Sequence, residues 1–284
     1  MIGDEAFYRQ DFFDDTFPKG LAEIGKYAFR YCNLSSAHFH EGLLLLDDYA
    51  FSDSSLEDVS LPASLMLIGE GIFSGCKYLK TISIAEGNTE ISLKNSCLIR
   101  NSDQTLIAWI PGDNADHCQV PDGVRRIGES AFWRCSGLKT VFLPDSVEEI
   151  GCVAFQECTS LQEIQFGSKL AHIDISAFQG CSSLTQITLP QSLRKIEGAC
   201  FSDCTSLAEV TLLENLKTLG SYAFKGCSAL TKLTLPGNLE TLGEGTFDGC
   251  FALKQIFPSD SLFARKVEYQ IRQSEIKQRM PWMR

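Results

Sequence analysis

A phenylalanine recurs at a fixed interval along almost the whole chain of 284 residues. The first four copies lie 22 residues apart, and the last six lie 23 residues apart. The ten residues are Phe7, Phe29, Phe51, Phe73, Phe132, Phe155, Phe178, Phe201, Phe224 and Phe247. A strict period of this length is typical of a solenoid, in which one short unit stacks on copies of itself. The spacing therefore predicts a repeat fold, and it directs the search for function towards the faces of a stack.

The repeating unit is clearest in Ile127–Pro144 and Leu219–Pro236, which read IGESAFWRCSGLKTVFLP and LGSYAFKGCSALTKLTLP. Both copies fit the pattern (I/L)-G-x-x-A-F-x-x-C-x-x-L-x-x-(I/V/L)-x-L-P. The L-x-x-I-x-L part ends in strict alternation, which predicts a half-buried strand, and the proline after it ends that strand. We call the I-G-x-x-A-F part the return segment, and we expect its Ala-Phe pair to fill the interior of each coil. So short a unit leaves room for only short extended or 3₁₀ pieces on this side.

This pattern resembles the BspA-like leucine-rich repeats, which occur on surface proteins of bacteria and of some parasitic protists. The resemblance covers roughly residues 2–257 and rests on ten copies of the unit. It implies a leucine-rich repeat solenoid and a non-enzymatic role in adhesion, in which host matrix proteins, host cells or other microbes are bound. Repeats of this kind are scaffolds whose ligands vary, so the resemblance is more specific for fold than for function.

The period predicts one continuous, right-handed solenoid of about eleven coils over residues 1–258, with a parallel sheet on its concave side. Parallel strands stack about 4.8 Å apart, so the array is expected to be on the order of 50 Å long. The eleven strands should begin near Phe12, Leu34, Leu56, Leu79, Ala115, Leu138, Leu161, Leu184, Leu207, Leu230 and Leu253. The end coils should look atypical, because each lacks one neighbour.

One interval breaks the period, because Phe73 and Phe132 are 59 residues apart. Within it, the segment Cys97–Ile110 has two apolar runs around the turn sequence Asn101–Gln104, which predicts a hairpin. Its second run lies too close to the next strand to be a parallel neighbour in the same sheet, since such strands need a long crossover. We therefore expect a hairpin insertion at about residues 86–114 that replaces a return segment.

The repeat pattern vanishes after Pro258, and Ser261–Met280 is rich in helix formers and in Lys and Arg. Apolar residues give this segment a broad, imperfect apolar side. We interpret residues 259–284 as a helical cap over the last coil or a tail. A linker or stalk to another part of a longer protein is the alternative.

The charge and hydropathy of the chain exclude some classes of binding partner. The net charge of −11 argues against nucleic acid and anionic membrane surfaces as partners. No apolar run approaches about 18 residues, so no membrane insertion is expected. The first residues, MIGDEAF, start inside a repeat and lack the basic region and apolar run of a signal peptide. The resemblance alone implies a cell-surface or secreted protein, and an intracellular location stays open.

Eight of the twelve cysteines lie three residues after a repeat phenylalanine, so the period accounts for them. They are Cys32, Cys76, Cys135, Cys158, Cys181, Cys204, Cys227 and Cys250. We expect a buried ladder of free thiols that serve as small apolar fillers, without a metal or another cofactor. The four histidines lack a neighbouring nucleophile motif, and no glycine-rich phosphate loop is present, so we expect no catalytic residues and no enzyme.

The outward positions of the strands form a short, polar and almost featureless face, and Phe142 is the exception. It is flanked by Gln119 and Gln165 in the expected register, and His117 lies on the preceding strand. Exposed aromatic residues are where binding energy concentrates. We therefore predict that a protein ligand, which the resemblance implies to be a host matrix or cell-surface protein, binds near Phe142 and near Trp109 on the hairpin. An intracellular scaffold and a carbohydrate-binding module remain alternatives.

Overall fold

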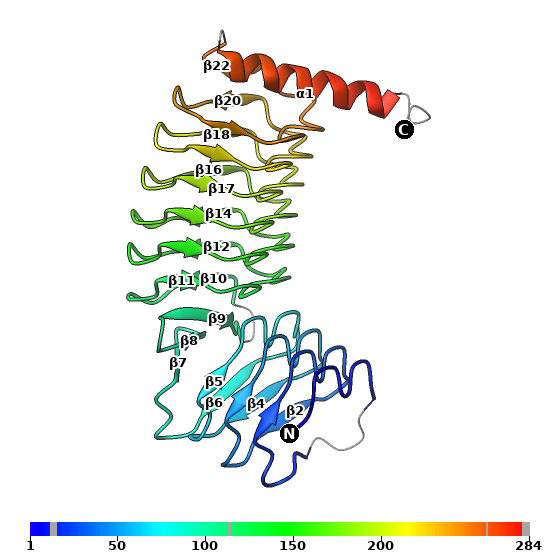
Figure 1. The fold of residues 1–284 in the computed structure, drawn as a ribbon, viewed down its shortest axis with the longest axis vertical. Helices are drawn as coiled ribbons and strands as arrows, with labels where there is room; N and C mark the ends of the chain where they lie inside the picture. The colour runs from blue at the N-terminus through cyan, green and yellow to red at the C-terminus, as the bar shows by residue number, and fades with distance from the viewer. Residues whose placement is uncertain (12–15, 113–114, 260, 280–284) are drawn as a thin grey trace.

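The computed structural model describes residues 1–11, 16–112, 115–259 and 261–279. The chain winds into a solenoid of about ten coils and ends in one helix (Figure 1). This confirms the predicted leucine-rich repeat solenoid. The hand of the coil and the concavity of its main sheet remain predictions.

The main sheet, here called the front sheet, receives one short strand from each coil, and its strands pair in parallel. Inward residues such as Val141 are buried, whereas their neighbours Thr140 and Phe142 are partly exposed. The first expected strand, near Phe12, falls largely outside the described residues, although Thr16 forms an isolated parallel bridge with His38. The front strands are β2 (Ser36–His38), β4 (Asp58–Leu61), β6 (Thr81–Ile84), β10 (His117–Gln119), β12 (Thr140–Phe142), β14 (Glu163–Gln165), β16 (Gln186–Thr188), β18 (Glu209–Thr211), β20 (Lys232–Thr234) and β22 (Gln255–Phe257).

A second set of two-residue strands, here called the back sheet, runs along the other side of the coils, where short extended pieces were expected. Each strand places one residue outward and one apolar residue inward, just before the return segment turns. These strands also pair in parallel between successive coils. They are β1 (Glu23–Ile24), β3 (Leu45–Leu46), β5 (Leu67–Ile68), β11 (Arg126–Ile127), β13 (Glu149–Ile150), β15 (His172–Ile173), β17 (Lys195–Ile196), β19 (Thr218–Leu219) and β21 (Thr241–Leu242).

The return segments stack their phenylalanine rings through the interior, as predicted. Phe155 and Phe178 lie 5.0 Å apart between ring centroids and are almost parallel. The backbone turns sharply on both sides of each ring, because the residues two before and two after it adopt positive φ. Around Phe132 these are Ser130, with φ of 59°, and Arg134, with φ of 58°. Left-handed conformations are costly for residues other than glycine, so the stacked ladder must hold them in place.

The hairpin lies on the return side, as predicted, and it has three strands rather than two. Strands β7 (Ile91–Lys94), β8 (Cys97–Arg100) and β9 (Thr105–Trp109) pair antiparallel, and β9 also pairs in parallel with β11. Trp109 lies 23 residues before Phe132 and stacks on it with ring centroids 5.7 Å apart. It therefore occupies the place of a ladder phenylalanine.

The expectation of one uninterrupted solenoid is wrong at this hairpin. The front sheet is broken between β6 and β10, as it also is between β14 and β16, and here the buried apolar residues divide into two clusters. The hairpin separates them, since Leu98 and Ile107 belong to the first cluster and Leu106 and Trp109 to the second. We call residues 1–85 the N-terminal stack and residues 115–259 the C-terminal stack. The coils of the two stacks are visibly tilted relative to each other (Figure 1).

Helix α1 (Leu262–Arg279) covers the last coil, at the top of Figure 1. The Ser261 hydroxyl accepts a hydrogen bond of 3.0 Å from the Ala264 amide, which caps the start of the helix. Ala264 and Val267 are fully buried in the C-terminal cluster. Among the described residues, no helix combines the length and the apolar character that crossing a membrane requires.

Candidate functional site

Phe142 lies on the front sheet, where the sequence placed it. It pairs with Gln119 of β10 on one side and with Gln165 of β14 on the other. Both glutamines are exposed, whereas Phe142 is half-buried and points to the same outward face. The structure therefore brings these three predicted site residues together in one row across three strands.

His117 lies in the same region but is tied to neighbouring charges. Its Nδ1 atom is 3.3 Å from Asp116, and the Lys139 ammonium is 3.0 Å from the same carboxylate. The hydrogen bond from Lys139 lowers the pKa of the exposed Asp116 most, and the contact with His117 lowers it further. The group is a small surface ion-pair cluster beside the Phe142 row.

The hairpin approaches the Phe142 row through its first turn and not through Trp109. The Asn95 side-chain amide donates a 3.3 Å hydrogen bond to the carbonyl of Gln119. Trp109 is only 5% exposed, because its ring is packed on Phe132 within the ladder. The prediction of Trp109 as an exposed aromatic beside Phe142 is therefore wrong. Its 23-residue distance from Phe132 was the sequence signal for a ladder position.

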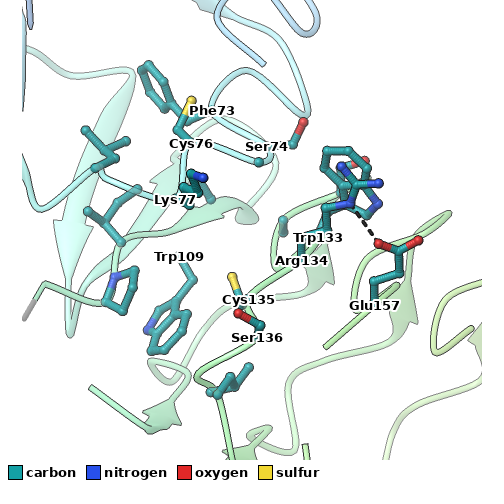
Figure 2. A pocket seen from close by; sticks show the side chains of 18 of the residues that line it. Phe73, Ser74, Cys76, Lys77, Trp109, Trp133, Arg134, Cys135, Ser136 and Glu157 are labelled. Carbon is teal, nitrogen blue, oxygen red and sulfur yellow. Dashed lines mark hydrogen bonds and ion pairs between the residues drawn. The ribbon is translucent and has the colours of Figure 1, made fainter. Parts of the chain in front are cut away.

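Trp109 instead lines a pocket of about 580 Å³ between the two stacks (Figure 2). The volume is within the range typical of ligand pockets. Coils from both stacks contribute to its wall. The sequence did not predict this pocket, because the pocket depends on how the two stacks meet. The lining includes Phe73, Gly75 and Cys76 from the N-terminal stack, and Pro111, Trp133 and Ser136 from the chain after β9.

Ion pairs and one aromatic ring hold the two sides of this pocket together. Asp53 of the N-terminal stack lies 3.8 Å from Arg134 of the C-terminal stack, and Arg134 also pairs with Glu157 at 2.8 Å. The Trp133 ring lies close to Gly75, where a β-carbon would approach it to 2.8 Å. The rim of the pocket is therefore charged, while aromatic rings and thiols line its interior.

The cysteine ladder is present, and all twelve cysteines are free thiols. The Sγ atom of Cys181, for example, donates to the carbonyl of Phe155 at 3.2 Å. Burial raises the pKa of this thiol to about 12. Six of the eight ladder cysteines are buried, as predicted, whereas Cys76 and Cys135 are partly exposed and both line the pocket. These two thiols mark the place where neighbouring coils no longer cover the ladder.

One group of side chains has the types that bind metals. Ligand atoms of His172, Asp174 and Glu197 lie within 4.8 Å of one another on the back-sheet side. Glu197, however, already forms an ion pair with the Lys195 ammonium. A cationic group therefore already neutralises one of the two carboxylates.

A family model for the BspA type leucine rich repeat region matches the chain in six copies, over residues 1–102, 112–198 and 172–269. The chain belongs to this BspA-type leucine-rich repeat family. No curated protein matches it. Leucine-rich repeat proteins of this type are typically non-enzymatic scaffolds that bind proteins, and they are typically associated with cell surfaces.

Several solved structures of bacterial proteins are similar to this BspA-type chain. A leucine-rich cell surface protein from Faecalibacterium prausnitzii is 27% identical with a TM-score of 0.70, over 93% of this chain and 65% of its own. This chain thus spans slightly less than two thirds of that protein. A leucine-rich repeat protein from T. pallidum is 34% identical with a TM-score of 0.52, over 58% of this chain and 77% of its own. The pneumococcal vaccine antigen PcpA is 20% identical over 94% of this chain and 73% of its own; its TM-score of 0.75 reflects a shared fold.

Proposed function

We propose that this BspA-type chain is a non-enzymatic adhesion module that binds a host or microbial surface protein through the front sheet around Phe142. The observation that carries the proposal is the row Gln119, Phe142 and Gln165, in which a large aromatic ring lies between two exposed polar side chains. Aromatic residues that are partly buried before binding lose little side-chain entropy in a complex, and such residues dominate protein interfaces.

Two features of the surroundings suit a protein ligand. The cluster of His117, Asp116 and Lys139 lies beside the aromatic residue and supplies the polar rim that interfaces usually have. Asn95 at the hairpin turn extends the face beyond the sheet edge. Trp109 is not part of this surface.

The test is a binding screen of the purified chain against immobilised fibronectin, laminin and collagen, with a glycan array in parallel. For any protein that binds, Phe142→Ala should weaken the affinity about thirtyfold or more, because a truncated hot-spot aromatic costs at least about 2 kcal/mol. Phe257→Ala is the matched control, since Phe257 occupies the same repeat position on β22 and is 47% exposed. Equal losses in both variants, or binding to glycans alone, would contradict the proposal.

A further inference from the structure

The return segments are joined by a regular ladder of backbone hydrogen bonds. In each coil, the amide of the ladder aromatic donates to the carbonyl of the residue just before the next ladder aromatic. The donors are Phe7, Phe29, Phe51, Trp109, Phe132, Phe155, Phe178, Phe201 and Phe224. The amide two residues after the ladder aromatic donates to the carbonyl of the residue just after the next ladder aromatic. Asp53, for example, donates to the carbonyl of Ser74 at 2.7 Å. Each coil thus uses its neighbour to satisfy two buried donors.

This ladder stops inside the chain at Phe73. Within the described residues, the amides of Phe73 and Gly75 have no acceptor, although Phe73 is only 5% exposed. The ladder also ends at the last coil, as expected, because α1 takes the place of a further coil. There the Gly249 amide donates to the Ser274 hydroxyl of α1 at 3.0 Å. Buried backbone donors are almost always paired in folded proteins, so the open donors at Phe73 need an explanation.

The opposite side of the gap has the complementary defect. By the ladder pattern, the carbonyl of Trp133 should accept from the residue two positions after Trp109. That residue is Pro111, which has no amide hydrogen, and no backbone donor to Trp133 is present in the described parts of the chain. The open acceptor and the open donors thus belong to the two inner ends of one interrupted ladder.

Both inner ends line the pocket between the stacks. Phe73 and Gly75 contribute from one side, and Pro111 and Trp133 from the other. The Phe73 ring stacks on Phe51 in the N-terminal core, and in Figure 2 it points away from Trp109. The Trp109 ring stacks on Phe132 in the other core. The pocket therefore occupies the position in which a return segment would connect the two ladders.

We propose that this pocket binds a short extended peptide segment of a protein partner, which continues the return ladder across the gap. Carbonyl groups of the peptide accept from the Phe73 and Gly75 amides, and one peptide amide donates to the Trp133 carbonyl. A small or aromatic side chain enters among Trp109, Cys76 and Cys135, as the Ala-Phe pair does in a coil. Addition of a strand-like segment to open backbone groups is an established mode of peptide recognition. This site is separate from the Phe142 row and does not depend on it.

The probe is the peptide DISAFQG-amide with fluorescein coupled to its N-terminal amine, and it has the sequence of the return segment at residues 174–180. We expect saturable binding in fluorescence anisotropy. Ser136→Trp, which fills the pocket from its wall, should weaken binding at least tenfold. Ser228→Trp is the matched control, because Ser228 is exposed at the same repeat position in a coil away from the pocket. Phe142→Ala should leave peptide binding unchanged, so this result is independent of the adhesion test.

Amide hydrogen exchange measured by NMR distinguishes ladder continuation from simple burial of the peptide ring. In the free protein, the Phe73 and Gly75 amides should exchange at least tenfold faster than the paired Phe51 and Phe155 amides, and saturating peptide should slow them at least tenfold. The same peptide with its phenylalanine replaced by serine should bind more weakly. Absence of binding, binding without protection of Phe73, or equal effects of Ser136→Trp and Ser228→Trp would each overturn the proposal.

Discussion

Each ladder phenylalanine stabilises the solenoid through two separate groups. The ring of Phe155 is fully buried between Phe132 and Phe178, at centroid distances of 4.5 and 5.0 Å. Its amide donates to the carbonyl of Ala177 at 2.7 Å. Phe142 has the same side chain but points outward from a strand, so its ring contributes less to the core. Identical residues therefore have different roles, which their positions in the repeat determine.

Truncation of these two residues should separate the roles. Phe155→Ala leaves a cavity between two stacked rings, and it should lower the free energy of unfolding by about 3–5 kcal/mol. Phe142→Ala removes a half-buried ring from the surface and should cost less than about 1.5 kcal/mol. Urea denaturation of the two variants and the parent checks this. Equal destabilisation by both would mean that the ring of Phe142 belongs to the core.

The buried thiols should make the protein sensitive to alkali. Burial raises the pKa of Cys181 to about 12 from an ordinary value near 9. Between these values the unfolded chain releases a proton that the folded chain keeps, so the stabilisation is complete below pH 9 and is lost as the pH rises towards 12. Each such thiol adds a slope of up to about 1.4 kcal/mol per pH unit.

Cys181→Ala should make the free energy of unfolding fall less steeply with pH, by the contribution of one thiol. The substitution should also lower stability at every pH. Urea denaturation at pH 8, 9 and 10 gives the slope for the variant and the parent. Ser182→Ala, in the adjacent position without a titrating group, should keep the slope of the parent. An unchanged slope in Cys181→Ala would show that this thiol titrates alike in the folded and unfolded chains.

At the scale of single elements, the period predicted the strands and turns of each coil but not the structure of the segment where the period breaks. The alternating L-x-x-I-x-L pattern correctly gave the front strands, because inward and outward residues follow from one position in the unit. Glycines at Gly75, Gly226 and Gly249 marked the left-handed position after the ladder aromatic, and that signal was available in the sequence. Trp109 was missed because only phenylalanine was counted.

Strand β7 was missed because its turn is atypical in sequence. Asn95 and Ser96 both have positive φ, at 49° and 62°, which is the backbone of a tight hairpin turn. Asparagine is common there, but the second position usually holds glycine. The pocket and the break in the front sheet were beyond prediction for a different reason. They depend on the tilt between two stacks, and no local pattern encodes that tilt.

The turn offers a direct test of this interpretation. Ser96→Gly removes the cost of a side chain at positive φ, so it should raise the free energy of unfolding by about 0.5–1 kcal/mol. Ser102→Gly, in the other hairpin turn, is the control, because Ser102 does not have positive φ and should gain nothing. Thermal unfolding of both variants checks the difference. A loss of stability in Ser96→Gly would argue against the left-handed turn.

At the scale of the whole molecule, polar contacts join the two stacks at a point where the ladders do not. Glu70 of the N-terminal stack accepts from Arg126 and from the Glu129 amide of the C-terminal stack, and it also lies 3.4 Å from Arg100 of the hairpin. Its side chain is 19% exposed, so water competes only partly for these contacts. The carboxylate is therefore the centre of the junction.

Removal of its charge should loosen the junction measurably. Glu70→Gln should destabilise the protein by about 1–3 kcal/mol, because it leaves partly buried donors without a charged acceptor. Glu157→Gln breaks one exposed pair with Arg134 and should cost less than about 1 kcal/mol. Guanidinium denaturation of both variants checks the ranking. If the two substitutions had equal effects, the junction would not depend on Glu70.

The interruption at Phe73 also has a mechanical consequence. Within each stack, hydrogen bonds of the back sheet and of the return ladder run from coil to coil and would share a pulling force applied to the two ends. At the junction both sets of bonds are missing, and the load falls on the hairpin, the Glu70 contacts and the Asp53–Arg134 pair. Stretched in an optical trap, the molecule should yield first between its stacks, at a lower force than that needed to peel any coil from its neighbour.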